Sequence, residues 1–151
     1  MTLRDALHSD DLAARLDAAL DFLKAHPAVS SADLGVVGLS LGASWGLWLA
    51  NHRADVIGAL VAFYGTFDGD LSQMRAAFLG HFAEHDDYEP REALEQLDQT
   101  LTARQLESTV YVYSGTGHWF FEADRPDAYH AESARLAWEW TIKFLHEKLG
   151  G

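Results

Sequence analysis

A nine-residue run without a charged side chain, residues 56–64 (VIGALVAFY), constrains the fold of this 151-residue chain more than any other segment. Polar residues do not alternate with the apolar ones, so both faces of a strand built from this run must be covered. Strands of parallel sheets, which carry helices on both sides, are buried in this way. The run therefore predicts a parallel α/β sheet.

Further segments of strand and helix type surround this run. Short apolar stretches predict strands at 34–38, 76–82 and 109–113, and apolar residues at helical spacing predict helices at 9–26, 41–52, 90–101 and 127–148. Pro90 fits the first position of the third of these helices. Strands that alternate with helices predict a three-layer α/β/α fold with a short, mostly parallel sheet of about four strands. The length predicts one domain over residues 1–151.

Composition narrows the function classes. The chain has 11 basic and 23 acidic residues, a formal net charge of −12, which should repel phosphate backbones and disfavours nucleic acid as a partner. No apolar run approaches the roughly 20 residues of a membrane span, and the first residues (MTLRD) lack the apolar core of a signal peptide. We therefore expect a cytoplasmic protein. The absence of cysteine excludes thiolate chemistry.

The stretch VVGLSLGAS, residues 36–44, places Ser40 between Gly38 and Gly42. An apolar strand precedes the serine and a helix follows it, which is the context that the G-x-S-x-G nucleophile elbow requires. A serine hydroxyl is a weak nucleophile and needs a base and a group that orients the base. The rest of the chain must supply both.

Two further residues follow predicted strands in the order that an α/β-hydrolase requires. Asp86 follows the strand at 76–82, and His118 follows the strand at 109–113 after two glycines. Because the carboxyl ends of parallel strands share one edge, these side chains should meet Ser40. Asp87 is adjacent to Asp86, and either carboxylate could instead cap the next helix.

Three motifs resemble those of the dienelactone hydrolase family of α/β-hydrolases: GLSLG at 38–42, FAEHDDYEP at 82–90 and YSGTGHWF at 113–120. The segment at 125–145 is similar to the tail that follows the catalytic histidine in that family. The resemblance implies a catalytic triad in which Ser40 is the nucleophile, Asp86 the acid and His118 the base. It also implies that the Leu41 N–H is one donor of the oxyanion hole, and it implies no cofactor.

The resemblance covers only the later part of the family's fold, so we expect a minimal α/β-hydrolase that lacks the N-terminal strands. The loop that normally supplies the second oxyanion donor is then missing as well. The strand at 34–38 should lie in the middle of the sheet, and here its outer edge would be open. An open apolar edge invites association, which predicts a homo-oligomer.

Other residues near the three motifs have two interpretations. Trp119 and Phe120 beside His118, Tyr64 at the end of its strand and Leu39 in the elbow are candidates for a substrate pocket. Arg125 could bind a substrate carboxylate or form a salt bridge beside a helix. His81 and His85 are four residues apart, but they lie on a strand that runs into a turn, so no metal site is expected.

These observations favour a carboxylic-ester hydrolase for small or short-chain esters, or for lactones, that works through an acyl-enzyme. No lid segment interrupts the short polar loop after residue 64, which favours small substrates. The alternative is a catalytically silent part of the fold that acts as an oligomerising or binding module.

Overall fold

The computed structural model describes residues 10–150, which fall into two compact units divided between Ala32 and Asp33. The first unit holds α2 (Asp10–Ala25), which agrees with the predicted helix at 9–26; Ser9 lies outside the described residues. The turn after α2 contains Pro27, which cannot continue a helix. The prediction of one domain over 1–151 stays a prediction.

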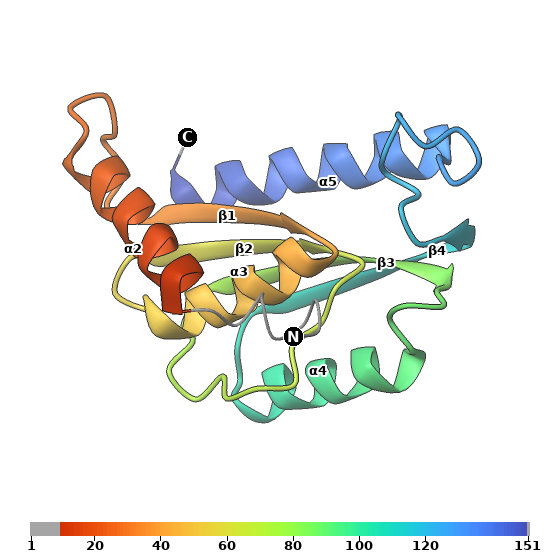
Figure 1. Cartoon of the computed structure of the whole chain (residues 1–151), viewed down its shortest axis with the longest axis horizontal. Helices are drawn as coiled ribbons and strands as arrows, with labels where there is room; N and C mark the ends of the chain where they lie inside the picture. The colour runs from red at the N-terminus through yellow and green to blue at the C-terminus, as the bar shows by residue number, and fades with distance from the viewer. Residues whose placement is uncertain (1–9, 151) are drawn as a thin grey trace. The chain divides into compact units, whose positions relative to one another are not determined.

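The second unit is built on a parallel sheet. Its elements in chain order are β1 (Leu34–Leu39), α3 (Leu41–His52), β2 (Ile57–Phe63), β3 (Ala77–His85), α4 (Arg91–Ala103), β4 (Ser108–Gly117) and α5 (Ala131–Leu149). The four strands lie in the order β1-β2-β3-β4, and each neighbouring pair is parallel (Figure 1). This confirms the predicted four-stranded parallel sheet.

Helices cover both faces of this sheet. In Figure 1, α5 runs above the sheet and α4 lies below it. A Cβ atom on Gly35 of β1 would lie 2.8 Å from Leu149 of α5, so this face of β1 packs closely on α5. On the opposite face, a Cβ atom on Gly46 of α3 would lie 3.3 Å from Val36 and 2.9 Å from Leu60. The second unit therefore has the predicted three layers.

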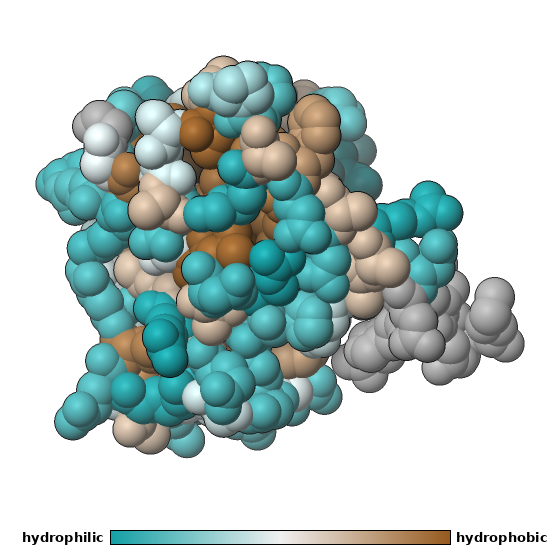
Figure 2. All heavy atoms as spheres, turned by 90° about the vertical axis from the view of Figure 1, so that its left-hand side faces the viewer, coloured by the Kyte–Doolittle hydropathy of each residue, from teal (hydrophilic) through white to brown (hydrophobic). Residues whose placement is uncertain are grey.

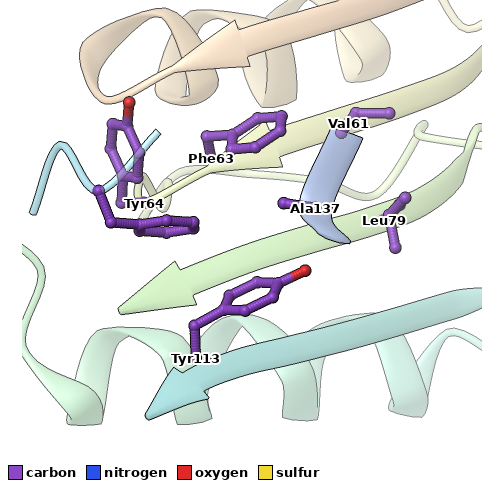
Figure 3. Packing of buried hydrophobic residues seen from close by; sticks show 7 residues of the cluster. Val61, Phe63, Tyr64, Leu79, Tyr113 and Ala137 are labelled. Atoms are coloured by element: carbon purple, nitrogen blue, oxygen red, sulfur yellow. The ribbon is translucent and has the colours of Figure 1, made fainter. Parts of the chain in front are cut away.

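The core on the α5 side is formed by β2, β3 and β4 together with α5 (Figure 3). Val61, Phe63 and Leu79 are at most 2% exposed, and Ala137 of α5 is fully buried against them. Six of the seven residues of β2 are buried, as the uninterrupted apolar run predicted. Because β2 is buried on both faces, packing fixes its position, and with it that of the residues that follow its carboxyl end.

A histidine interrupts this apolar core. His81 of β3 is fully buried; its Nδ1 lies 2.8 Å from the Tyr113 hydroxyl and its Nε2 lies 3.1 Å from Oγ1 of Thr141. Burial lowers the pKa of His81 from 6.5 to about 3. Both ring nitrogens of His81 thus have hydrogen-bond partners within the protein. The side chain of His85, in contrast, is 77% exposed. The two histidines do not form a metal pair.

Several predicted boundaries are wrong by a few residues. β3 extends to His85 and β4 to Gly117, each beyond the apolar run that predicted it. α5 begins at Ala131 and not at 127, because turns occupy the chain from Trp119 to Tyr129. Pro90 is the N-cap of α4 with extended backbone angles, and not its first helical residue.

Hydrophilic side chains cover most of the face shown in Figure 2, with apolar residues visible between them. Among the helices of the described residues, none combines the length and apolar character needed to cross a membrane.

We predict that His81 makes stability pH-dependent. Because burial holds the pKa of His81 near 3, the unfolded chain binds more protons between pH 6.5 and pH 3. The free energy of unfolding should therefore fall as pH falls through this window, by up to about 1.4 kcal/mol per pH unit from this residue. Urea unfolding should show that the free energy of unfolding decreases less from pH 7 to pH 5 in His81→Gln than in the wild type. Equal losses in the two proteins would contradict this.

Candidate active site

Ser40 lies in a strained turn between β1 and α3. Its backbone angles are φ 51° and ψ −120°, a region that costs a non-glycine residue about 1–3 kcal/mol. Glycine neighbours make the turn possible: a Cβ on Gly38 would lie 2.3 Å from the Gly42 carbonyl oxygen, and one on Gly65 would lie 2.2 Å from the Ser40 carbonyl oxygen. The Ser40 N–H donates to the Phe63 carbonyl at 2.8 Å. The turn is therefore held by β2 as well as by its own glycines.

The structure brings Ser40, His118 and Asp86 together in one chain of hydrogen bonds. Ser40 Oγ lies 2.9 Å from His118 Nε2, and His118 Nδ1 lies 2.7 Å from Oδ2 and 2.9 Å from Oδ1 of Asp86. The side chains of His118 and Asp86 are only 4% and 5% exposed. The arrangement has the order nucleophile, base and orienting carboxylate.

The carboxylate of Asp86 is held by the backbone of the turn that follows β3. Its Oδ1 accepts hydrogen bonds from the N–H groups of Tyr88 at 2.9 Å and Glu89 at 3.0 Å. Burial opposes ionisation of this carboxyl group, but the bonds from His118 and from the two N–H groups outweigh burial and lower the pKa of Asp86. Of the two adjacent carboxylates, the imidazole is bonded to Asp86 and not to Asp87.

Leu41 is the first residue of α3, so its N–H belongs to the first turn, where donors have no partner within the helix. Leu41 is 39% exposed beside the elbow. A helix N-terminus that follows a nucleophile can stabilise developing negative charge. The position of Leu41 is therefore compatible with the role that the family resemblance implies.

Aromatic rings surround the imidazole of His118. The ring centroids of Tyr64, Tyr88 and Trp119 lie 4.7, 4.9 and 4.9 Å from that of His118. An open pocket of about 730 Å³ adjoins the imidazole, and Tyr88, Trp119 and Arg125 contribute to its lining. Ser40 does not line this pocket, which therefore opens on the His118 side of the triad.

Two of the residues proposed for the substrate pocket are in the core instead. Phe120 is fully buried, with its ring centroid 5.0 Å from that of Tyr113. Tyr64 is also fully buried, behind the imidazole and not at an open surface. Leu39 is half-buried and packs against the core cluster. Of the four residues proposed for the substrate pocket, Trp119 lines the pocket beside His118.

Arg125 forms a salt bridge in this structure. Its Nε donates to Glu122 Oε2 at 2.6 Å, and its guanidinium lies 4.3 Å from the centroid of the Trp119 ring. The hydrogen bond from Arg125 to Glu122 raises the pKa of the guanidinium, so it stays charged. Of the two interpretations of Arg125, the ion pair beside a helix describes its observed contacts.

Sequence reasoning missed the residues that tie the loops of the site together. Ser44 of α3 donates to the Thr66 carbonyl at 2.6 Å, and Thr66 Oγ1 donates to Glu89 at 2.6 Å. These pairs connect segments that are 22 and 23 residues apart, and no local spacing signals such contacts. Among the residues that the structure describes, no group of three or more His, Asp or Glu side chains could hold a metal ion.

Comparison with known proteins identifies the family. The sequence profile of the dienelactone hydrolase family matches residues 1–149. The chain belongs to the dienelactone hydrolase family. Its parallel sheet, its layers of helices and the turn that holds Ser40 agree with the α/β-hydrolase fold.

Individual proteins that resemble this chain are longer than it is. A Bradyrhizobium protein named "Probable 2-oxo-3-(5-oxofuran-2-ylidene)propanoate lactonase" is 29% identical over 90% of this chain and 59% of its own length. Protein usf of Aquifex pyrophilus is 29% identical over 93% of this chain and 62% of its own length. The solved structure of a dienelactone hydrolase-like promiscuous phosphotriesterase from metagenomic libraries superposes with a TM-score of 0.81 at 21% identity, over 89% of this chain and 60% of that one. This chain spans about three fifths of the length of each of these three proteins.

We predict opposite effects of alanine at the two glycines of the elbow. Gly38→Ala should destabilise the protein by about 2–3 kcal/mol, because the new Cβ would overlap backbone atoms of Gly42 and Ala43. Gly42→Ala is the matched control: its Cβ would enter open space at the start of α3, so stability should rise by about 0.5–1 kcal/mol. Urea unfolding measures both changes, and equal stability of the two variants would contradict the described elbow.

Proposed function

We propose that this chain is a carboxylic-ester hydrolase for small or short-chain esters, or for lactones, and that Ser40, His118 and Asp86 are its catalytic triad. The observation that carries the proposal is the unbroken chain of hydrogen bonds from Ser40 Oγ through the imidazole to the Asp86 carboxylate. Membership of the dienelactone hydrolase family supports this reaction class. So does the lactonase name of the Bradyrhizobium relative.

The proposed reaction has two halves. His118 Nε2 takes the proton of Ser40 as Oγ attacks the ester carbonyl, and the Leu41 N–H stabilises the resulting oxyanion. When the tetrahedral intermediate collapses, His118 gives the proton to the leaving alcohol, and the acyl group remains on Ser40. Water then attacks the acyl-enzyme and gives a proton to His118, which passes it to Ser40 Oγ as the acid is released. Throughout, Asp86 holds the tautomer with a proton on Nδ1 and offsets the charge of the imidazolium.

The shape of the site favours small substrates. The segment between β2 and β3, residues 64–76, contains neither a helix nor a strand that could form a lid. The open pocket lies on the His118 side, where the leaving alcohol receives its proton, so we assign it to the alcohol part of the substrate.

The triad gives a direct prediction for substitutions. Ser40→Ala should abolish hydrolysis of p-nitrophenyl acetate and butyrate, because the variant has no nucleophile. Asp86→Asn should lower kcat by about 10⁴-fold, since an amide no longer holds the productive tautomer of His118. Asp87→Asn is the matched control on the adjacent residue and should retain most of the activity. Equal activity of the wild type and Ser40→Ala would refute the proposed function.

A second candidate function, an oligomerising module, is favoured by the outer edge of β1. β1 pairs with β2 on one side, and no strand of the described residues pairs with its other side. Val37 of β1 is 42% exposed and Leu41 beyond it is 39% exposed. An apolar edge strand with free backbone groups is a template for pairing with another chain. We propose that a second copy of the chain covers this edge.

This assembly can be tested at the two edges of the sheet. The wild type should be a dimer or larger oligomer in light scattering at micromolar concentration. Val37→Lys should make it monomeric, because a lysine on an edge strand opposes pairing. Val112→Lys changes a residue of β4, at the opposite edge, that is 56% exposed, and should leave the oligomer intact. A monomeric wild type would exclude the proposal.

A further inference from the structure

Two residues that touch His118 have left-handed backbone conformations without being glycine. Tyr64 has φ 37° and Trp119 has φ 68°, and their rings lie 4.7 and 4.9 Å from the imidazole. Such conformations persist only where the surrounding structure holds them in place, and they concentrate at functional sites. Both residues therefore need a support that lies outside the triad itself.

Glu122 connects these two residues. Its Oε1 accepts a hydrogen bond from the Tyr64 hydroxyl at 2.9 Å. Its Oε2 accepts one from Arg125 Nε at 2.6 Å, and the guanidinium of Arg125 lies over the Trp119 ring. Each carboxylate oxygen thus supports one of the two rings that flank His118, directly for Tyr64 and through Arg125 for Trp119.

The backbone after His118 brings Glu122 to this place. The Glu122 N–H donates to the Trp119 carbonyl at 2.9 Å, and the Arg125 N–H donates to the Glu122 carbonyl at 3.0 Å. Two successive turns therefore fold the chain back toward the imidazole. The carboxylate of Glu122 is 22% exposed, whereas Tyr64 at the other end of its hydrogen bond is fully buried.

We propose that Glu122 is a positioning residue that acts through Tyr64 and through Arg125 and Trp119 to hold the His118 imidazole at hydrogen-bond distance from Ser40. Burial raises the pKa of Tyr64, so its hydroxyl stays protonated and remains a donor to Glu122. Without the carboxylate, the two rings lose a common anchor and the imidazole can tilt away from Ser40 Oγ. The kinetic part of this proposal rests on the proposed ester hydrolysis.

The test compares Glu122→Gln and Tyr64→Phe with the wild type in two measurements. The first is steady-state hydrolysis of p-nitrophenyl acetate, where a displaced base should lower kcat about 10- to 100-fold and change KM much less. The second is the far-downfield proton NMR signal of His118 Nδ1–H in its bond to Asp86, which should broaden or shift in both variants. Glu122→Gln leaves one acceptor oxygen for two donors, and Tyr64→Phe removes one of those donors, so both substitutions weaken the same network. The activity loss of the double variant should therefore be smaller than the product of the two single losses.

Thr141→Val is the control for a purely structural effect, because it removes a buried hydrogen bond to His81 in the core. It should lower stability while the kcat and the downfield signal stay as in the wild type. Unchanged kcat and an unchanged signal in both test variants would overturn the role of Glu122, as would an equal loss in Thr141→Val. If the wild type hydrolyses no ester, the proposed function fails, and the NMR signal still tests the positioning of His118. If Glu122→Gln does not fold, Tyr64→Phe decides.

Discussion

The parallel pairing of the strands is the constraint on which the site depends. Leu39 of β1 is level with Phe63 of β2, and Phe63 is level with His81 of β3. Strands in this register end at a common edge, so the residues that follow them meet although they are far apart in the sequence. The hydrogen-bonded arrangement of Ser40, His118 and Asp86 is therefore a consequence of sheet topology, and the turns at the strand ends set its distances.

Much of this arrangement could be predicted from the residues alone. The uninterrupted apolar run at 56–64 predicted a buried parallel strand, and the glycines around Ser40 predicted the sharp turn at the start of α3. The sequence pattern alone leaves Asp86 and Asp87 as alternative orienting carboxylates, and the family resemblance implies Asp86. In the structure, the hydrogen bonds from the His118 imidazole and from two backbone N–H groups go to Asp86.

Other features depend on contacts that have no local signature. Phe120 follows Trp119, and the left-handed backbone of Trp119 helps to send one ring to the pocket and the next into the core. In the sequence, His81 is a potential metal ligand, but in the structure its hydrogen-bond partners, Tyr113 and Thr141, are 32 and 60 residues away. The carboxylate of Glu122 likewise gains its importance from Tyr64, 58 residues earlier. Side-chain pairs across such separations require the folded structure.

The hydrogen bonds of Thr66 bear on how this fold can acquire new segments. Gly65 is pressed against Ser40, and Thr66 is bonded to α3 and to Glu89 beside the Asp86 turn. Extra residues placed before Thr66 would separate Ser40 from the turn that carries Asp86. Residues 68–70 are exposed, so additional chain can enter there without disturbing these bonds. The exposed segment that could accept a lid or a fused domain thus begins at residue 68, only two residues beyond Thr66, which its hydrogen bonds hold in place.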